Sequence, residues 1–275
     1  MNYNLLDRIK IVLVEPAGGL NVGSIARVMK NMGLSNLVLV NPQCDLTGDD
    51  ARKMAVHAVE VLEQAAIFDS LPDALTGCQL AIATTARSRS LPTQFESPRQ
   101  GVKYLLQPQI NSALIFGPED RGLSNSELKY AQKFIYIDSN PAYPSLNLAQ
   151  AVAICTYEIY QASIDNSETY DTPQKSQASN SGDYLAEYSP FTLNFGSISV
   201  NNAPLEVLEA YYQHLETVLL EIGYLYPHTA IARMDKLRRI YNRANLNREE
   251  VAMLRGILRQ MQWFNSQKCS SDSKQ

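Results

Sequence analysis

The chain has 275 residues, and 24 Lys and Arg stand against 28 Asp and Glu, so its formal net charge is -4 at pH 7. This acidic balance excludes a uniformly basic nucleic-acid-binding protein, and any nucleic acid must meet a local patch. No apolar run reaches the roughly 18 residues that span a bilayer. The four cysteines (Cys44, Cys78, Cys155 and Cys269) show no metal-binding spacing. We therefore expect a cytoplasmic protein without a membrane segment or a metal.

The first 160 residues alternate short apolar runs with helix-like segments. The runs are rich in β-branched residues and cover residues 9–14, 36–40, 79–84, 113–116 and 134–137. Such runs are typical of strands that helices cover on both faces of a parallel sheet. We predict an α/β domain over residues 1–162.

Two helices of this domain carry polar residues at their starts. Asn21 is a candidate N-cap for a helix whose apolar face ends at Gly33, and this helix includes Arg27. A second helix is predicted over Leu146–Tyr160, where Ser145 is a candidate N-cap. Small residues on this second helix would permit close packing, including against a second subunit.

The composition changes after the α/β domain. Residues 163–203 are rich in Ser, Asn, Gln, Thr and Tyr, which predicts a flexible linker. Helical spacing returns in residues 205–222, 230–243 and 248–264, so a small all-α domain is expected over 204–264. The Ser/Lys/Gln-rich residues 265–275 are expected to form a disordered tail.

Basic residues concentrate in the second domain. Between Arg233 and Arg259 there are eight Lys and Arg against three acids. Within an acidic protein this local excess favours a phosphate-facing surface, because phosphate neutralisation supplies most sequence-independent affinity for nucleic acid. The alternative is an ordinary solvated helix face.

Three short polar segments follow apolar runs and open helix-like ones. They are Asn21–Arg27 (NVGSIAR), Phe116–Ser124 (FGPEDRGLS) and Pro144–Gln150 (PSLNLAQ). Loops at strand ends are where α/β proteins bind ligands, yet there is no P-loop, dinucleotide fingerprint, nucleophile elbow or zinc-protease motif. The remaining hydroxyls, amides and one arginine are suited to orienting an alcohol and an electrophile, as methyl transfer from a sulfonium cofactor requires.

The order of these segments, NVGSIAR, LIFGPEDRGLSNSEL and PSLNLAQAVAICTYEIY, resembles the three motifs of the SPOUT-class (TrmH-like) RNA ribose methyltransferases. The C-terminal MDKLRRIYNRANLNREEVAMLRGIL resembles the helical extension of the TrmJ subgroup. The resemblance implies an α/β domain with a mostly parallel sheet and a C-terminal trefoil knot. It also implies a homodimer, S-adenosylmethionine (SAM) as cofactor, and methylation of a tRNA 2′-hydroxyl at nucleotide 32 of the anticodon loop, on cytidine, uridine or both.

The resemblance also implies roles for individual residues. The cofactor positions are Thr84, Thr85, Ala86, Gly117, Ile137, Pro144, Ser145 and Leu146. The catalytic positions are Arg27, Ser145 and Asn147, and the tRNA-binding positions are Asn21, Ser24, Glu119, Lys236, Arg238, Arg239 and Arg243. Taken alone, Ile137 and Leu146 are as typical of core packing, and Arg27 of a surface salt bridge.

Arginine is a poor general base, because its pKa exceeds about 12. Our hypothesis is that Arg27 clamps the target phosphate and stabilises the developing 2′-alkoxide, while the proton leaves to phosphate or water. Two other functions remain open. One is the same chemistry on ribosomal RNA or another tRNA site, and the other is a non-catalytic RNA-binding paralogue.

Overall fold

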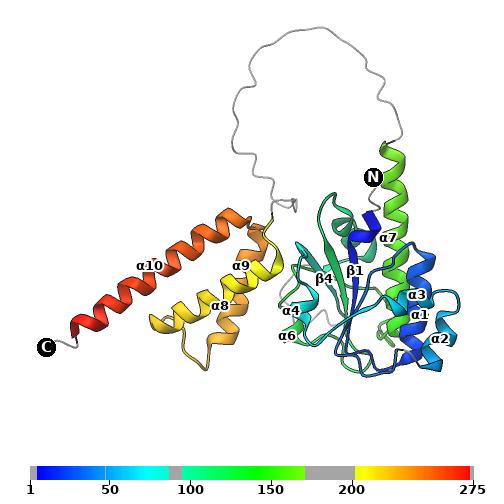
Figure 1. Ribbon diagram of the computed structural model, residues 1–275, viewed down its shortest axis with the longest axis horizontal. Helices are drawn as coiled ribbons and strands as arrows, with labels where there is room; N and C mark the ends of the chain where they lie inside the picture. The colour runs from blue at the N-terminus through cyan, green and yellow to red at the C-terminus, as the bar shows by residue number, and fades with distance from the viewer. Residues whose placement is uncertain (1–4, 47, 87–94, 171–201, 273–275) are drawn as a thin grey trace, which may run out of the picture.

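The structure is a computed structural model that describes residues 5–46, 48–86, 95–170 and 202–272. It shows an α/β domain joined to a separate group of three helices (Figure 1). Most of the predicted linker, residues 171–201, and the tail residues 273–275 lie outside the described residues. No described helix is both long enough and apolar enough to cross a membrane.

The α/β domain is built on one seven-stranded, fully parallel sheet in the order β3-β2-β1-β6-β4-β7-β5. The strands are β1 (Ile9–Val14), β2 (Leu37–Val40), β3 (Ala66–Phe68), β4 (Leu80–Thr84), β5 (Phe95–Glu96), β6 (Ser112–Phe116) and β7 (Lys133–Ile135). All five predicted strands are confirmed. The sequence pattern misses β3 and β5 because they are short edge strands that lack a continuous buried apolar run.

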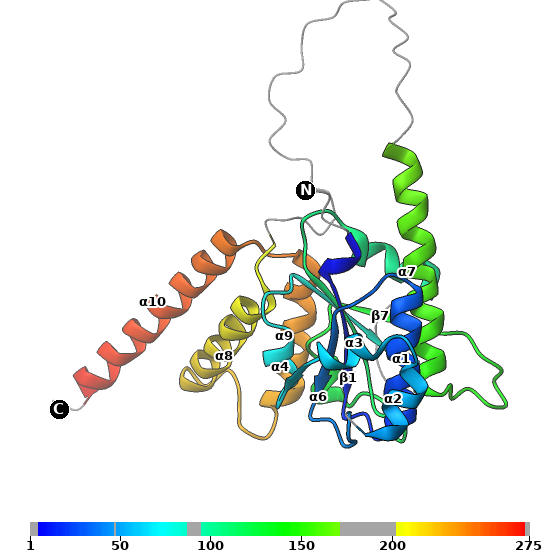
Figure 2. The same cartoon turned by 45° about the vertical axis from the view of Figure 1, so that its right-hand side comes forward.

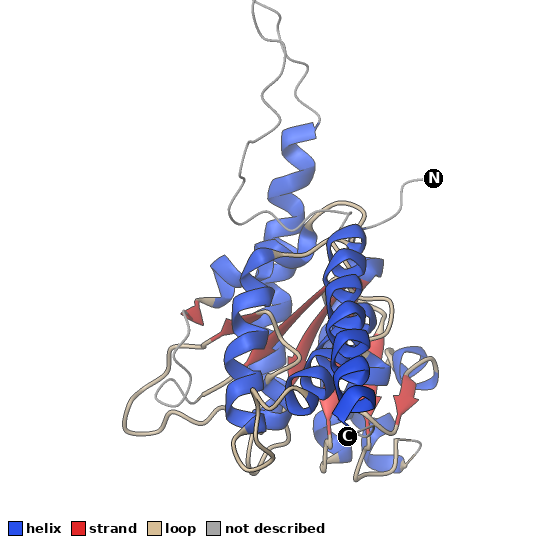
Figure 3. Ribbon diagram, turned by 90° about the vertical axis from the view of Figure 1, so that its left-hand side faces the viewer, coloured by secondary structure: helices blue, strands red, loops and turns tan. Residues whose placement is uncertain are grey.

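Helices cover both faces of this sheet (Figure 3). Before β6 the chain forms η1 (Leu5–Arg8), α1 (Gly19–Asn31), α2 (Asp49–Ala55), α3 (Val59–Glu63), α4 (Leu71–Ala74), α5 (Pro98–Gly101) and η2 (Val102–Leu106). After β6 it forms α6 (Asn125–Leu128) and α7 (Leu148–Tyr170). Helices α1 and α7 pack side by side on one face, whereas α4 and α6 cover the other.

Glycine permits the close contact between α1 and α2. A Cβ on Gly23 would lie 2.2 Å from the carbonyl oxygen of Ala51, so a larger residue there would push the helices apart. Helix α1 ends before Gly33, which adopts a positive φ of 70° as a helix-terminating glycine commonly does. Gly23 lies inside the NVGSIAR segment, so this packing fixes where the segment's polar residues project.

The structure corrects both predicted N-caps. Helix α1 begins at Gly19 after Gly18, so Asn21 lies within the first turn with its side chain free for a tertiary contact. Helix α7 is capped by Asn147 and not by Ser145, because the Asn147 Oδ1 accepts hydrogen bonds from the amides of Ala149 at 2.9 Å and Gln150 at 3.4 Å. Helix α7 also continues to residue 170, ten residues beyond its predicted end.

The second part of the chain contains α8 (Leu205–Glu221), α9 (Ala230–Ala244) and α10 (Arg248–Asp272). These helices match the three predicted ones, except that α10 extends through residues 265–272, where a disordered tail was expected. Their shared core includes Tyr211, Leu215, Val218, Met234 and Val251. A separate apolar core is what allows this segment to form a domain of its own.

The helical domain contacts the α/β domain through the start of α8. The Leu205 amide donates to the Cys78 carbonyl at 2.9 Å, and the Gly77 amide donates to the Glu206 carboxylate at 3.1 Å. The Leu205 side chain packs against the core clusters of both domains. In Figures 1 and 2, α9 accordingly lies on the side of the helical domain that faces α4 and α6.

Candidate cofactor and substrate site

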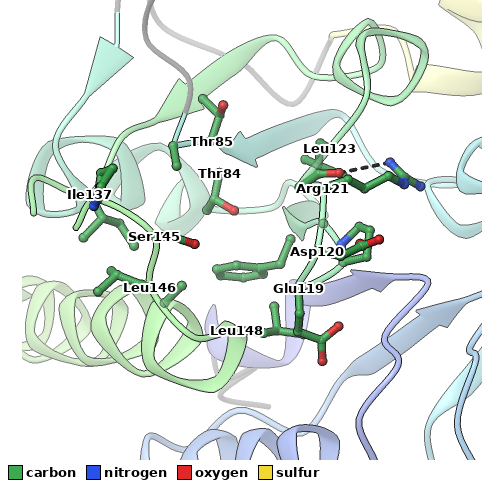
Figure 4. Close-up of a pocket in the computed structure, with 17 residues that line it drawn as sticks. Thr84, Thr85, Glu119, Asp120, Arg121, Leu123, Ile137, Ser145, Leu146 and Leu148 are labelled. Carbon is green, nitrogen blue, oxygen red and sulfur yellow. Dashed lines mark hydrogen bonds between the residues drawn. The ribbon is translucent and has the colours of Figure 1, made fainter. Parts of the chain in front are cut away.

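A cavity of about 340 Å³ opens at the carboxyl ends of β6, β4 and β7, which are consecutive in the sheet (Figure 4). Three loops form its walls, one after each strand. The structure brings together in this cavity all eight residues predicted as cofactor positions: Thr84, Thr85, Ala86, Gly117, Ile137, Pro144, Ser145 and Leu146. A crevice beyond the carboxyl ends of parallel strands is the usual ligand site of an open α/β sheet.

Other lining residues escaped the sequence analysis: Phe116, Pro118, Asp120, Arg121, Gly122, Leu123, Leu148 and Ala151. Most of them lie inside or directly beside the second and third motifs. Motif membership was the available signal, but it does not separate residues that face the cavity from residues that face away.

Hydrogen bonds hold the strand ends that form the cavity. The Thr84 hydroxyl donates to the Ile115 carbonyl at 3.0 Å, and the Thr85 amide donates to the Ile135 carbonyl at 3.0 Å. Figure 4 shows Thr84 and Ser145 among the side chains that line the cavity. These two hydrogen bonds therefore fix the backbone at strand ends that border the cavity.

Gly117 is required for the shape of the second loop. A Cβ at this position would lie 2.3 Å from the Leu123 nitrogen and 2.4 Å from the Gly122 carbonyl carbon, and both are backbone atoms. The loop can fold back on itself only without a side chain there. This glycine therefore sets the width of the cavity.

Arg121, which is itself a lining residue, anchors the same loop. Its guanidinium pairs with Glu15 at 2.6 Å and with Glu127 at 2.9 Å, and Glu127 in turn accepts from the amide of Ser124. These contacts join the end of β1 to the start of α6. The FGPEDRGLS segment is thus held at both ends, which pre-forms the cavity wall.

One hydrogen-bonded chain joins the three motifs. The Asn21 amide donates to Glu119 at 2.8 Å, and the Asn147 amide donates to the Asn21 oxygen at 3.0 Å. Glu119 also accepts from the Ala17 amide at 3.2 Å. Partial burial opposes ionisation of Glu119, yet the hydrogen bonds from Asn21 and from the Ala17 and Gly18 amides hold its pKa below the usual 4.5. Glu119 is therefore an ionised acceptor at neutral pH that fixes both asparagines.

This network predicts a pH-dependent contribution to stability. Because the pKa of Glu119 is lower in the folded protein, its stabilising effect is present above the usual value of 4.5 and is lost as the pH falls through the lowered value. We expect Glu119→Gln to lower the free energy of unfolding at pH 7, and the gap to wild type to close in acid. Urea unfolding of both proteins between pH 3 and pH 7 measures this gap, and a constant gap would contradict the prediction.

Two other predicted residues of this domain, Ser24 and Arg27, do not take part in the hydrogen-bonded chain of Asn21, Glu119 and Asn147. The Ser24 hydroxyl donates to the Leu20 carbonyl at 2.8 Å, within its own helix. Arg27 is exposed on α1, six residues or about 9 Å along the helix axis from Asn21. It does not line the cavity, and no residue that the structure describes forms an ion pair or hydrogen bond with its guanidinium. Within the described part of the chain, Arg27 therefore does not form the surface salt bridge that was its alternative interpretation.

The site offers oriented polar groups. Among the described residues, no group of three or more His, Cys, Asp or Glu side chains is placed to hold a metal ion. The cavity lies within the range of about 300–1,000 Å³ that small-molecule sites occupy. What the arrangement provides is a pre-formed pocket, an amide network and, about 9 Å along α1 from Asn21, an arginine that pairs with none of the described residues.

The basic helix α9 differs from the prediction at one residue. Arg238 is only 7% exposed, and its guanidinium makes two hydrogen bonds to Glu209, at 2.6 and 2.8 Å, while lying 4.4 Å from the centroid of the Tyr212 ring. We therefore remove Arg238 from the substrate-binding set, because its charge is neutralised inside the domain. Lys236 and Arg243 are exposed and Arg239 is partly exposed, so these three stay available to a ligand.

Because Arg238 is paired with Glu209, we expect substitution of Arg238 to lower the stability of the protein without removing a contact to the ligand. Arg238→Met removes one partner and leaves the Glu209 carboxylate largely buried and unpaired, which we expect to lower the free energy of unfolding by about 2 kcal/mol. Adding Glu209→Leu removes the orphaned charge and should restore much of the loss. Urea unfolding of the single and double variants measures this, and equal losses in both would contradict the ion-pair explanation.

The fold and the site define a class of protein: a parallel α/β domain with a cavity of cofactor size, joined to a basic helical domain. The model of the SpoU rRNA Methylase family matches residues 8–157, and the model of the tRNA methyltransferase TrmJ C-terminal domain matches residues 206–274. The chain belongs to the SpoU methylase family, in its TrmJ subgroup.

Two curated relatives are similar in sequence to this protein along nearly its whole length. A tRNA (cytidine/uridine-2′-O-)-methyltransferase TrmJ of Pectobacterium atrosepticum is 40% identical over 94% of this chain and 98% of its own. A tRNA (cytidine/uridine/adenosine-2′-O-)-methyltransferase TrmJ of Pseudomonas aeruginosa is 38% identical over 94% and 95%. The crystal structure of TrmJ from Z. mobilis superposes with a TM-score of 0.73 at 30% identity, covering 92% of this chain and 98% of that one.

Proposed function

We propose that this protein transfers a methyl group from SAM to a ribose 2′-hydroxyl of tRNA. The observation that carries the proposal is the convergence of the eight cofactor positions on one cavity, next to the hydrogen-bonded chain of Asn21, Glu119 and Asn147. The names of the two relatives above describe the same reaction.

The cavity suits SAM by its size and by its lining. Backbone groups beside Thr85, Gly117 and Leu146 provide donors and acceptors for an adenine edge, and Ile137 and Leu146 provide apolar cover for its faces. When bound, the sulfonium supplies an activated methyl group. The trefoil knot is part of this proposal, and it is supported by the loops of residues 117–123 and 137–148, which both line the one cavity.

The chain's own residues orient the ribose. Asn147 caps α7 and is held by Asn21, so its position is fixed before RNA arrives. Ser145 lines the cavity and its side chain is exposed, where it can donate to the ribose. Arg27 is assigned to the target phosphate and to the developing alkoxide, because its exposed guanidinium, which pairs with none of the described residues, can form a bidentate contact.

A homodimer is also part of the proposal. Helix α7 exposes four large apolar side chains, Ile154, Tyr157, Tyr160 and Ile164, spaced three or four residues apart, so that they form one face. Leu20 on the neighbouring α1 is 53% exposed. A continuous apolar face on a helix that already packs on the sheet favours a protein interface, and sedimentation equilibrium measures the mass directly.

We place the target in the anticodon loop, at nucleotide 32, and the enzyme in the cytoplasm. The C-terminal domain supports the choice of tRNA, since the domain model matching residues 206–274 is that of a tRNA methyltransferase. The same chemistry on ribosomal RNA is the alternative.

The test is incubation of the purified protein with labelled SAM and either total tRNA or ribosomal RNA, followed by mass spectrometry of nuclease digests. We expect 2′-O-methylcytidine or 2′-O-methyluridine at nucleotide 32 in tRNA. Methylation of a base would overturn the mechanism, and methylation of ribosomal RNA alone would overturn the substrate. Binding of SAM without any methyl transfer to either RNA would favour a non-catalytic paralogue.

A further inference from the structure

A second cavity, of about 520 Å³, lies between the two domains. Its first wall is the α6–β7 segment of the α/β domain, including Lys129, and its second wall is helix α9. In both Figure 1 and Figure 2, α9 lies beside α6. We call this cavity the interdomain cleft.

Cations from both domains line the interdomain cleft. Lys129 comes from the α/β domain, and Lys236, Arg239 and Arg243 come from α9, whereas Asp235 is the single acid among the lining residues. None of the four cations forms an ion pair with a residue in the described part of the chain. The Lys129 ammonium lies 5.0 Å from the centroid of the Tyr130 ring, a contact that leaves its charge uncancelled.

Arg238, on the same helix, differs from the other cations that line the interdomain cleft. It also borders the cleft, but its charge is satisfied by Glu209 within the helical domain. Among the described residues, one arginine of α9 is therefore neutralised, and the other three cations of that wall have no acidic partner. In a protein of net charge -4, four cations that line one cavity and pair with no described acid create a local site for a polyanion.

Amide side chains add neutral donors from both walls. The oxygen of Gln132 accepts from the Ala81 amide at 2.8 Å, and the oxygen of Asn242 accepts from the Tyr212 hydroxyl at 2.6 Å. With both oxygens occupied, the NH₂ groups of these two lining residues are left to donate to an anion. Donors without competing acceptors suit phosphate and sugar oxygens.

The cleft is next to the cofactor cavity along the chain. Leu123 lines the cavity and Asn125 lines the cleft, so their Cα atoms are at most about 7 Å apart. Arg121 and Glu127 tie this segment to the end of β1. A nucleic-acid strand bound in the cleft would therefore contact the same segment, residues 121–127, that forms one wall of the cofactor cavity.

We propose that the interdomain cleft binds the sugar-phosphate backbone of RNA between the two domains, and that Lys129 provides the contact from the α/β domain. The inference rests on the proposed function, because it names where the tRNA is held. It goes beyond a basic helical domain that binds RNA alone, since one wall belongs to the domain that carries the cofactor cavity. RNA binding then also fixes the orientation of the two domains.

The experiment compares the full-length variants Lys129→Gln, Lys236→Gln and the double variant with Lys103→Gln. Lys103 is an exposed lysine of η2 that borders neither cavity. Affinity for total tRNA is measured by fluorescence anisotropy across a salt series, and SAM affinity by calorimetry. Each cleft variant should bind tRNA about three- to fivefold more weakly near 0.1 M salt, with a salt slope shallower by about one.

The outcomes separate this inference from the proposed function. SAM affinity should be unchanged in every variant, and Lys129→Arg should bind tRNA like wild type because it keeps the charge. If wild type binds and methylates tRNA but Lys129→Gln matches Lys103→Gln in affinity and slope, the cleft inference alone is overturned. If wild type neither binds nor methylates tRNA, the proposed function fails first. Lys129→Arg showing the same loss as Lys129→Gln would indicate a packing role and also overturn the inference.

Discussion

Arg27→Ala should lower kcat for methyl transfer by about 100- to 1,000-fold, the size expected when one preorganised donor to a developing oxyanion is removed. SAM affinity should stay at the wild-type value, because Arg27 does not line the cofactor cavity. The fold should also persist, since no described residue pairs with this guanidinium. Single-turnover assays with tRNA and SAM calorimetry measure the two effects separately.

Two further variants sharpen this prediction. Arg27→Lys keeps the charge but loses the planar fork, so it should recover little of the rate. Recovery of most of the rate would mean that charge alone matters. Arg52→Ala is the matched control, an exposed arginine on the neighbouring α2 whose contact with Glu63 at 3.2 Å is a surface ion pair of small energetic value. A similar rate loss in Arg52→Ala would remove the special role of Arg27.

Gly117→Ala should raise the dissociation constant for SAM at least about 100-fold, because the new Cβ displaces the backbone that shapes the cavity. The clash with the Leu123 and Gly122 backbone cannot be relieved by a side-chain rotation. We also expect a loss of about 1–3 kcal/mol in the free energy of unfolding, the usual cost of overpacking. Calorimetry with SAM and urea unfolding measure both.

Gly256→Ala is the matched control for this substitution. A Cβ at Gly256 meets no atom within 4 Å, and the residue lies inside α10. Alanine there should stabilise the helix by about 0.5–1 kcal/mol and leave SAM binding unchanged. Wild-type SAM affinity in Gly117→Ala would contradict the assignment of this cavity to the cofactor.

Much of the architecture was predictable because buried parallel strands have a strong signature. The five long apolar runs became strands, and the three C-terminal helices formed where their spacing indicated. The failures have local causes. β3 exposes Ala66 and Ile67 at the sheet edge, so no buried run marks it, and α10 continues into a polar segment that composition alone assigned to a tail.

The site was predictable in its members but not in its connections. Motif order was enough to name the eight predicted cofactor residues, all of which line the cavity, but it missed other lining residues in or beside the same motifs. It did not show that Asn21 is a tertiary partner of Glu119 in place of an N-cap, because that choice depends on a residue 98 positions away. Nor did it separate the roles within α9, where adjacent Arg238 and Arg239 both border the interdomain cleft but only Arg238 is paired with Glu209.

The sequence by itself determined the α/β class, the three C-terminal helices and the family, because each depends on local patterns and motif order. Only the tertiary structure decided which polar groups meet and which charges remain free. Hydrogen bonds and ion pairs act over a few ångströms, so the pairing of Arg238 and the placement of Lys129 opposite α9 follow from how distant segments pack.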